Sequence, residues 1–483
     1  MSFRILDVAK PLASLLPEIE LPYERVSFDD KIVYTIASAA IYLLASVPLS
    51  GIQPSKIVDP FHWLRFSFAS QSGTLLELGV LPVLTAGFFW QTLAALRWCK
   101  VNFNSLEERQ LFQSLQKITA IFLGFFYSTL LVYSGYFKPV DHFVSQSHQS
   151  GFLADSLIIL QLTVASAAVT YLCELLEKGY GFGPGCMAFI AVTTAYKLAG
   201  SVIGFGYAPW SKDGQAEGVL VQLFNSLFSK GFIYTIYNAF TRIENINLAQ
   251  VYLAFITLFC LMYTYNFRSE ISIKSSKVRS MITTYPIRLF HSGALPLIFT
   301  LTVIYNANIY AYAFSKIVCP IPFIANWEIN AYTKKTADLT SGLLYFISSS
   351  NASTSIILNL TRIVVSISFI TIVCALFGRS WFKLAGSSGK DLARQFKEQD
   401  ITVIGYRDAT IARELNKLIS SASTAGSVVL GLTTSIAEAT GYSQGFATGV
   451  GIGMLCAMSV LEDIMTDVQQ GNANGTQFQQ VFG

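Results

Sequence analysis

The sequence contains few charged residues and few groups that could carry out chemistry. Asp, Glu, Lys and Arg make up 13% of its 483 residues, whereas hydrophobic residues make up 52%, a balance typical of membrane proteins. The four histidines, His62, His142, His148 and His291, form no HExxH motif or ligand-spaced cluster. Seven cysteines are scattered without a CxxC pair, which favours packing over disulfides or metal ligands. We therefore expect no enzymatic activity, no cofactor and no metal site.

Two glycine-rich segments also lack the residues that a nucleotide site requires. The run Gly179–Gly185 has no Lys-Ser/Thr pair after it and no strand before it, so it predicts a flexible turn. Gly449, Gly451 and Gly453 lie in an apolar stretch, where small residues favour close helix packing.

Long apolar stretches are what the sequence does have. Each is close to the roughly 20 residues that a helix needs to cross a hydrocarbon core of about 30 Å. Within lipid such segments should be helical, because every backbone polar group must be satisfied internally. We predict ten spans, at residues 31–50, 73–96, 114–137, 152–174, 186–206, 246–267, 291–314, 356–377, 420–437 and 443–464.

Lysine and arginine are distributed unequally between the two sides of these spans. With the N-terminus inside, inner segments carry 22 of the 33 basic residues and outer segments carry 9, while Lys197 and Arg362 lie in or beside spans. An eleventh span at 219–240 would place 13 inside and 17 outside, against the positive-inside tendency. We therefore expect cytosolic termini, an external, partly buried hairpin at 207–245, and a Lys197 side chain that snorkels outward.

The ten spans divide into two sets of five. An odd number per set means that the second half enters from the opposite face, as an inverted repeat requires. The predicted fold is an all-α membrane protein with two pseudo-symmetric halves. Its expected regions are an amphipathic N-terminal segment at 1–30, halves at 31–206 and 246–465, cytosolic loops at 268–290 and 379–417, and a flexible tail at 466–483.

Five segments resemble, in order, parts of the alpha subunit of the eukaryotic SecY-type protein-conducting channel, the Sec sixty-one alpha family. DPFHWLRFSFASQSGTLLELGVLP is similar to that family's plug and second span, and WFKLAGSSGKDLARQFKEQDITVIGYRDATIARELNKLI to its loop between spans eight and nine. The other three are Phe3–Val26, Cys173–Gly185 and Ile271–Phe290. The resemblance covers roughly residues 3 to 465.

The resemblance implies a clamshell around an hourglass pore that apolar side chains close at the waist. The family's pore ring corresponds here to Val80, Leu84, Cys186, Ile190, Ile298 and Val450. A plug over residues 59–72, a short half-polar helix before the second span, would block the outer funnel. Its central residues are Phe61, His62, Trp63, Leu64, Arg65 and Phe66.

The same resemblance implies a lateral gate and a ribosome-docking surface. Polar gate positions correspond to Thr85 and Asn306, while Tyr127 stands where the family has glutamine. Ribosome contacts correspond to Lys277, Arg279 and Arg407, with Lys274 and Arg288 on the same face. The implied partners are gamma-type and beta-type single-span subunits, the ribosome with its RNA, the nascent polypeptide with its signal sequence, and membrane lipid.

The predicted function is therefore that of a pore-forming subunit in the endoplasmic reticulum membrane, which passes nascent chains into the lumen and releases membrane segments sideways. Differences at Tyr127 and Cys186 resemble a diverged fungal paralogue of the main channel. Two alternatives remain open from the residues alone. An inverted-repeat transporter of a small solute is the first, and a structural membrane scaffold is the second.

Overall fold

The structure is a computed structural model, and it describes most of the chain. The described residues are 11, 16–24, 26–52, 57–96, 98, 101, 105–137, 151–206, 216–242, 246–275, 282–318, 322–330, 336–348, 356–384, 389–398, 401–404, 408–440, 443 and 445–469.

The N-terminal half contributes five helices that correspond to the first five predicted spans: α2 (Phe28–Leu44), α3 (Leu81–Ala95), α4 (Leu106–Tyr133), α5 (Gly151–Leu175) and α6 (Gly185–Ile203). Local capping explains two of the starts. The Ser27 side chain accepts a hydrogen bond from the Asp30 amide, and Ser105 accepts one from the Glu108 amide. After α5 a π-helical turn, η4 (Leu176–Tyr180), contains Gly179 at φ +93°, a conformation that favours glycine.

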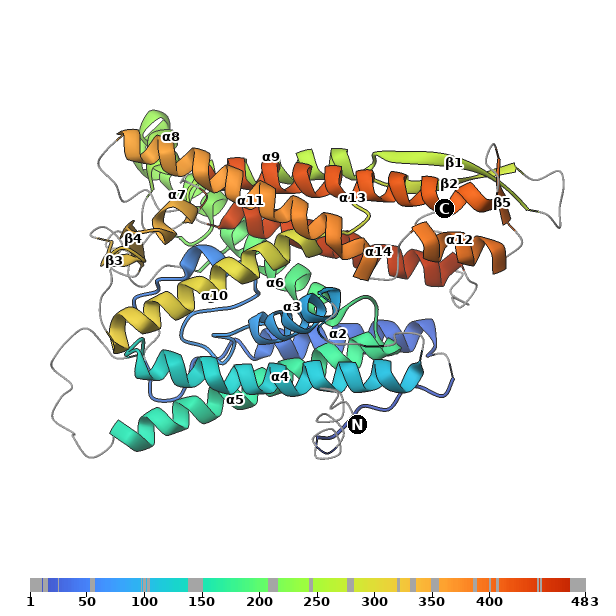
Figure 1. The fold of residues 1–483 in the computed structure, drawn as a ribbon. Coiled ribbons are helices and arrows are strands. Elements are labelled where there is room, and N and C mark those ends of the chain that lie inside the picture. The colour runs from blue at the N-terminus through green and yellow to red at the C-terminus, as the bar shows by residue number, and fades with distance from the viewer. Residues whose placement is uncertain are drawn as a thin grey trace.

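The C-terminal half contributes the other five long helices of the described chain: α9 (Leu248–Tyr265), α10 (Leu295–Ile317), α11 (Ile356–Leu384), α13 (Asp408–Ala439) and α14 (Phe446–Gln469). A capping box of Asn247 and Gln250 begins α9. Figure 1 shows the two halves as separate groups of helices, with α10 between them. The halves meet where α14 packs on α6, and where α10 packs on α3 and α4.

Shorter elements lie at the two ends of the bundle (Figure 1). The sheet end carries α12 (Gly389–Glu398) and an antiparallel sheet of order β2-β1-β5, formed by β1 (Arg268–Ser275), β2 (Ile282–Arg288) and β5 (Ile401–Val403). The opposite end, called here the hairpin end, carries α7 (Val219–Lys230), α8 (Phe232–Thr241), and the paired strands β3 (Asn326–Ile329) and β4 (Ala337–Ser341). Two 3-10 turns, η2 (His62–Leu64) and η5 (Leu344–Ile347), complete the elements named in this structure.

Several helices have bounds that differ from those of the predicted spans. The second span was expected from residue 73, but α3 begins only at Leu81 and has 15 residues, because residues 73–80 form turns. The predicted loop 379–417 contains the end of α11, α12, β5 and the start of α13, and α14 continues into the predicted tail as far as Gln469. Eight helices of the described chain are long and apolar enough to cross a membrane by themselves; α2 and α3 are shorter.

Candidate functional site

The residues expected at the waist are buried at the centre of the bundle. Val80, Leu84, Cys186, Ile190 and Ile298 are each at most 7% exposed and share one hydrophobic core cluster. Val80 caps α3 and accepts the Leu84 amide at 3.1 Å, so both side chains lie on one face of the helix.

Val450 lies apart from these five residues. It is 3% exposed but belongs to a neighbouring cluster with Val219 and Val251. The plug residue Phe66 packs against this second cluster. Five of the six expected ring residues thus lie in the main core cluster, and the sixth lies in a second cluster against which Phe66 packs.

Two cavities flank the waist and plug. A cavity of about 630 Å³ is lined by the waist residues Leu84 and Cys186 and by Phe299 and Trp381. A second cavity, of about 340 Å³, is lined by the plug residues Phe66 and Ala69 and by α6. The waist thus contributes to the wall of the first cavity, and the plug to the wall of the second.

The plug, residues 59–72, is seated by aromatic contacts. It is not the short helix that was expected, because its only regular structure is the 3-10 turn η2. The Phe61 ring lies 5.6 Å from the rings of both Tyr305 and Tyr312, and Phe68 lies 5.1 Å from Tyr305. Phe66 meets the Phe446 ring edge-on at 5.1 Å. Aromatic pairs at such separations add stabilisation beyond burial alone.

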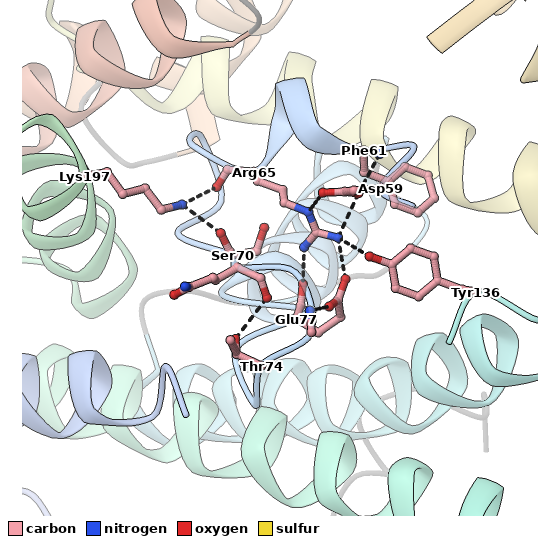
Figure 2. A network of polar contacts seen from close by, with 10 residues as sticks. Asp59, Phe61, Arg65, Ser70, Thr74, Glu77, Tyr136 and Lys197 are labelled. Atoms are coloured by element: carbon pink, nitrogen blue, oxygen red, sulfur yellow. Dashed lines mark hydrogen bonds and ion pairs between the residues drawn. The ribbon is translucent and has the colours of Figure 1, made fainter. Parts of the chain in front are cut away.

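A buried polar network also holds the plug (Figure 2). The Arg65 guanidinium donates to the carboxylates of Asp59 and Glu77, and to the Tyr136 hydroxyl at 2.9 Å. Glu77 also accepts the Gly73 amide at 2.5 Å. Burial would lower the pKa of Arg65, but the two carboxylates outweigh it and raise that pKa well above its ordinary value. Arg65 therefore remains charged and fixes the turns before α3.

Lys197 does not snorkel outward as predicted. Its ammonium group donates to the Ser70 carbonyl at 2.8 Å and to the Arg65 carbonyl at 3.5 Å, and it lies 4.8 Å from the Phe66 ring centre. Figure 2 shows this side chain reaching the plug backbone from α6. The plug supplies carbonyl oxygens inside the bundle, so the ammonium has partners without moving to the membrane surface.

The plug also contacts the C-terminal half. The Ala337 amide, at the start of β4, donates to the Asp59 carbonyl at 3.0 Å. The His62 Nε2 atom lies 3.8 Å from the Asp338 carboxylate. The same short segment is therefore attached to both halves of the clamshell.

The three expected gate residues meet across the contact between the halves. Tyr127 on α4 donates its hydroxyl hydrogen to the Asn306 side chain on α10, and the Asn306 amide donates to the Thr85 hydroxyl on α3 at 3.1 Å. The Tyr310 hydroxyl lies 3.5 Å from that of Tyr127. Tyr310 was not predicted, although it lies one helical turn after Asn306.

The expected ribosome-contacting residues are only partly described. Lys274 lies in β1, opposite Ile282 of β2 and Thr402 of β5. Lys277, Arg279 and Arg407 lie outside the described residues. Arg288, expected on the same face, forms an ion pair with Glu462 of α14.

Among the described residues, no group of three or more His, Cys, Asp or Glu side chains could hold a metal ion. The five described cysteines are free thiols, and four of them are buried. The closest pair, Cys173 and Cys186, has its sulfur atoms 3.3 Å apart beside the waist.

The span-ten glycines behave as packing residues, with one difference. A Cβ at Gly453 would meet Thr194 of α6, and one at Gly451 would meet Leu261 of α9. At Gly449 the close neighbour is Phe66, so this glycine admits the plug and not another helix.

Comparisons with known proteins agree with this arrangement. The SecY family matches residues 74–465, and the plug domain of Sec61p matches residues 41–73. The chain is 34% identical to the Sec sixty-one protein homolog of Saccharomyces cerevisiae over 100% of its length and 98% of that protein. It is 31% identical to the protein transport protein Sec61 subunit alpha of Dictyostelium discoideum, over 95% of each chain.

Two solved structures have the same fold. One, of the idle yeast Ssh1 complex bound to the yeast 80S ribosome, matches with a TM-score of 0.74 at 31% identity, over 99% of this chain and 98% of that one. Another, of a protein conducting channel, matches with a TM-score of 0.78 at 23% identity, over 97% and 99%. A ten-helix clamshell with a plug, matched along its whole length, means that this chain belongs to the SecY family.

Proposed function

We infer that this SecY-family chain is the pore-forming subunit of a protein translocation channel in the endoplasmic reticulum membrane, and that it is held closed in the structure by its plug. The observation that carries this proposal is the plug on a buried aliphatic waist, with one cavity lined in part by the waist and another lined in part by the plug. A waist of Val80, Leu84, Ile190 and Ile298 resists water and ions because it is narrow and hard to wet. It offers no side-chain specificity, which suits a cargo of varied sequence.

The side exit would lie between α3 and α4 on one half and α10 and α11 on the other. Hydrogen bonds among Thr85, Asn306 and Tyr127 join α3 and α4 to α10, and the Tyr310 hydroxyl adds a contact with Tyr127 at 3.5 Å. When this contact opens, an apolar cargo segment gains about 25 cal/mol per Å² by leaving for lipid. No chemical step is needed for this release.

Partners and orientation are part of the same proposal. The related Ssh1 complex is described as bound to the 80S ribosome, which supports ribosome docking at the sheet end through Lys274, Lys277, Arg279 and Arg407. That end would be cytosolic, with both termini, and the hairpin end lumenal. One gamma-type and one beta-type single-span subunit would complete the channel.

The chain would also represent the second fungal paralogue and not the main channel. It aligns along 100% of its length with the Sec sixty-one protein homolog, but along 89% with the protein transport protein SEC61 of the same yeast, at 34% identity in each case. The greater coverage supports the paralogue assignment. The SecY family match favours channel activity over the solute transporter and the scaffold.

Site-specific photocrosslinking to a stalled, ribosome-bound nascent chain in native membranes tests the conduit. Probes at Leu84 and Ile190 should crosslink to successive cargo positions as the chain lengthens. A probe at Phe259, an exposed residue of α9, is the matched control and should give no cargo adduct. Bound ribosomes without adducts at Leu84 and Ile190 would show that the waist is assigned wrongly.

A further inference from the structure

The hairpin of α7 and α8, residues 216–242, has an apolar face that the protein leaves uncovered. Along α7 the exposed large side chains are Leu220, Phe224, Leu227 and Phe228, which share one helix face by their spacing. Phe228 is 78% exposed, and its ring lies 5.3 Å from that of Phe224. On α8, Tyr237 and Phe240 are exposed three residues apart.

The hairpin also has a buried side, where Val219, Ser226 and Thr235 are at most 5% exposed. Ser226 and Thr235 line a small pocket between α7 and α8, and Val219 belongs to the cluster of Val251 and Val450. Arg242, also buried, donates to the Ala216 carbonyl at 2.5 Å and ties the end of α8 to the start of α7. The hairpin is therefore a seated amphipathic unit with one face outward.

Its position continues the surface that faces lipid. α7 packs on α6 and α8 packs on α9, and Figure 1 shows both short helices at the end of the bundle where α9 begins. The membrane-spanning α9 exposes Tyr252 close to that end and Phe259 further along. The exposed aromatics of the hairpin thus adjoin those of a spanning helix.

Neither helix of the hairpin can cross the bilayer. With 12 and 10 residues, they would span only about 18 Å and 15 Å at 1.5 Å per residue, against a core of about 30 Å. Gly231 at φ +84° separates them, so they do not join into one longer helix.

We propose that the α7–α8 hairpin is an interfacial membrane anchor, whose Phe224, Phe228 and Tyr237 side chains insert at the boundary between headgroups and acyl chains. Short amphipathic helices with aromatic apolar faces bind membranes in this way, and amphipathic aromatic rings concentrate at this depth. Among its 27 residues only Glu217, Lys230 and Arg242 carry charge, so bilayer insertion desolvates few charges.

The anchor lies on the connection between the two halves, after α6 and before α9. Fixing that connection at the membrane surface would hold the α6–α9 side of the clamshell at one depth while the proposed gate opens.

Photocrosslinking in membranes that contain an alkyne-tagged phosphatidylcholine tests the proposal on the full channel complex. Benzoylphenylalanine in place of Phe224 or Phe228 should yield lipid adducts at a level similar to that at Phe259 of α9. The exposed residue Glu328 of β3, at the same end, is the control for an aqueous position and should give none. Protein adducts in place of lipid adducts, or no adducts above the Glu328 level, would overturn the anchor.

A second measurement covers the case in which the probe disturbs folding. The variant Phe228→Trp adds one indole at the predicted depth, which increases the tryptophan fluorescence over that of wild type. Phospholipids brominated in their upper acyl chain should quench most of this added fluorescence. Added emission that brominated lipid leaves unchanged would likewise overturn the proposal.

Discussion

Lys197 lies inside the bundle with its ammonium group against the backbone of the plug. It donates to the Ser70 carbonyl at 2.8 Å from α6, a helix that contributes to the proposed waist. A hydrogen bond from a charged group contributes about 1.5–3 kcal/mol, and desolvation of the ammonium offsets part of this. The closed position of the plug therefore depends on a residue that the plug sequence does not contain.

We predict that Lys197→Met loosens the plug. If the closed plug position lost roughly 1–2 kcal/mol of stabilisation, the fraction of channels with an open plug would rise about 5- to 30-fold. The measurement is the ion conductance of the reconstituted complex in planar bilayers. Lys197→Arg keeps a cationic donor and should remain close to wild type. Equal conductance in the Met variant and wild type would remove Lys197 from plug retention.

Tyr127 supplies a hydroxyl to the polar contact across the proposed gate. The variant Tyr127→Phe removes the hydroxyl that bonds Asn306 and keeps the ring, at a cost of about 1 kcal/mol to the closed gate. We expect the variant to release into lipid test segments whose hydrophobicity is too low for release by the wild type. The measurement is the fraction of each segment in a graded series that becomes membrane-integrated. Tyr127→Gln, which restores the family residue, should also shift this threshold.

The control for the gate is Tyr133→Phe, in the same helix. Tyr133 is 69% exposed, so loss of its hydroxyl should leave the integration threshold unchanged. An unchanged threshold in both Tyr127 variants would mean that this contact does not limit gate opening.

At the scale of elements, α14 and the plug depend on a glycine for close approach. A Cβ at position 449 would come within 2.4 Å of the Phe66 Cβ, so Gly449→Ala should displace the plug and raise resting conductance. Gly200→Ala is the matched control, because a Cβ there meets nothing within 4 Å and alanine favours a helix by about 1 kcal/mol. Normal conductance in Gly449→Ala, at normal expression, would contradict the packing argument.

The sequence predicted the membrane helices well, because span length and charge asymmetry are local properties. It placed the start of the second span wrongly, at residue 73, since Leu75, Leu76 and Leu78 are apolar. In the structure these turns are fixed by Arg65, Asp59 and Glu77, which are contacts that hydropathy does not encode. The predicted plug helix is absent for the same reason, because side-chain partners from α6, α10 and the turn that follows α4 hold that segment in turns.

The sequence predicted the residues of the candidate gate but not the contact that Lys197 makes with the plug. The residues Thr85, Asn306 and Tyr127 came from a resemblance, and the structure joins them. The Lys197 contact could not be predicted, since residues 127 positions apart in the chain become neighbours only in the fold. Its one signal was a lysine inside an apolar stretch.

At the scale of the whole molecule, the plug links the two halves. Asp59 and His62 contact β4 of the C-terminal half, while Arg65 bonds Glu77 and Tyr136 of the N-terminal half. Separation of the halves must therefore stretch contacts on both sides of one short segment. Gate opening and plug release are expected to be coupled for this reason.

Ribosome docking would act at the sheet end, on the opposite end from the β3–β4 contact. Lysine and arginine that neutralise RNA phosphates displace counterions, so affinity falls steeply with salt. We predict that Arg407→Glu lowers ribosome affinity by roughly 10-fold or more and reduces the slope of log affinity against log salt by about one unit. Co-sedimentation of ribosomes with the reconstituted complex over a salt series measures both quantities.

Arg288→Gln is the control for this charge reversal. Arg288 already pairs with Glu462 and lies over the Tyr265 ring, so its charge is partly neutralised within the chain and its loss should change the salt slope little. If Arg288→Gln changed the salt slope more than Arg407→Glu, the docking surface would have to be assigned to the base of the β1–β2 hairpin and not to the loop before α13. Wild-type binding in the Arg407 variant would exclude that residue from docking, because a phosphate contact cannot survive reversal of its charge.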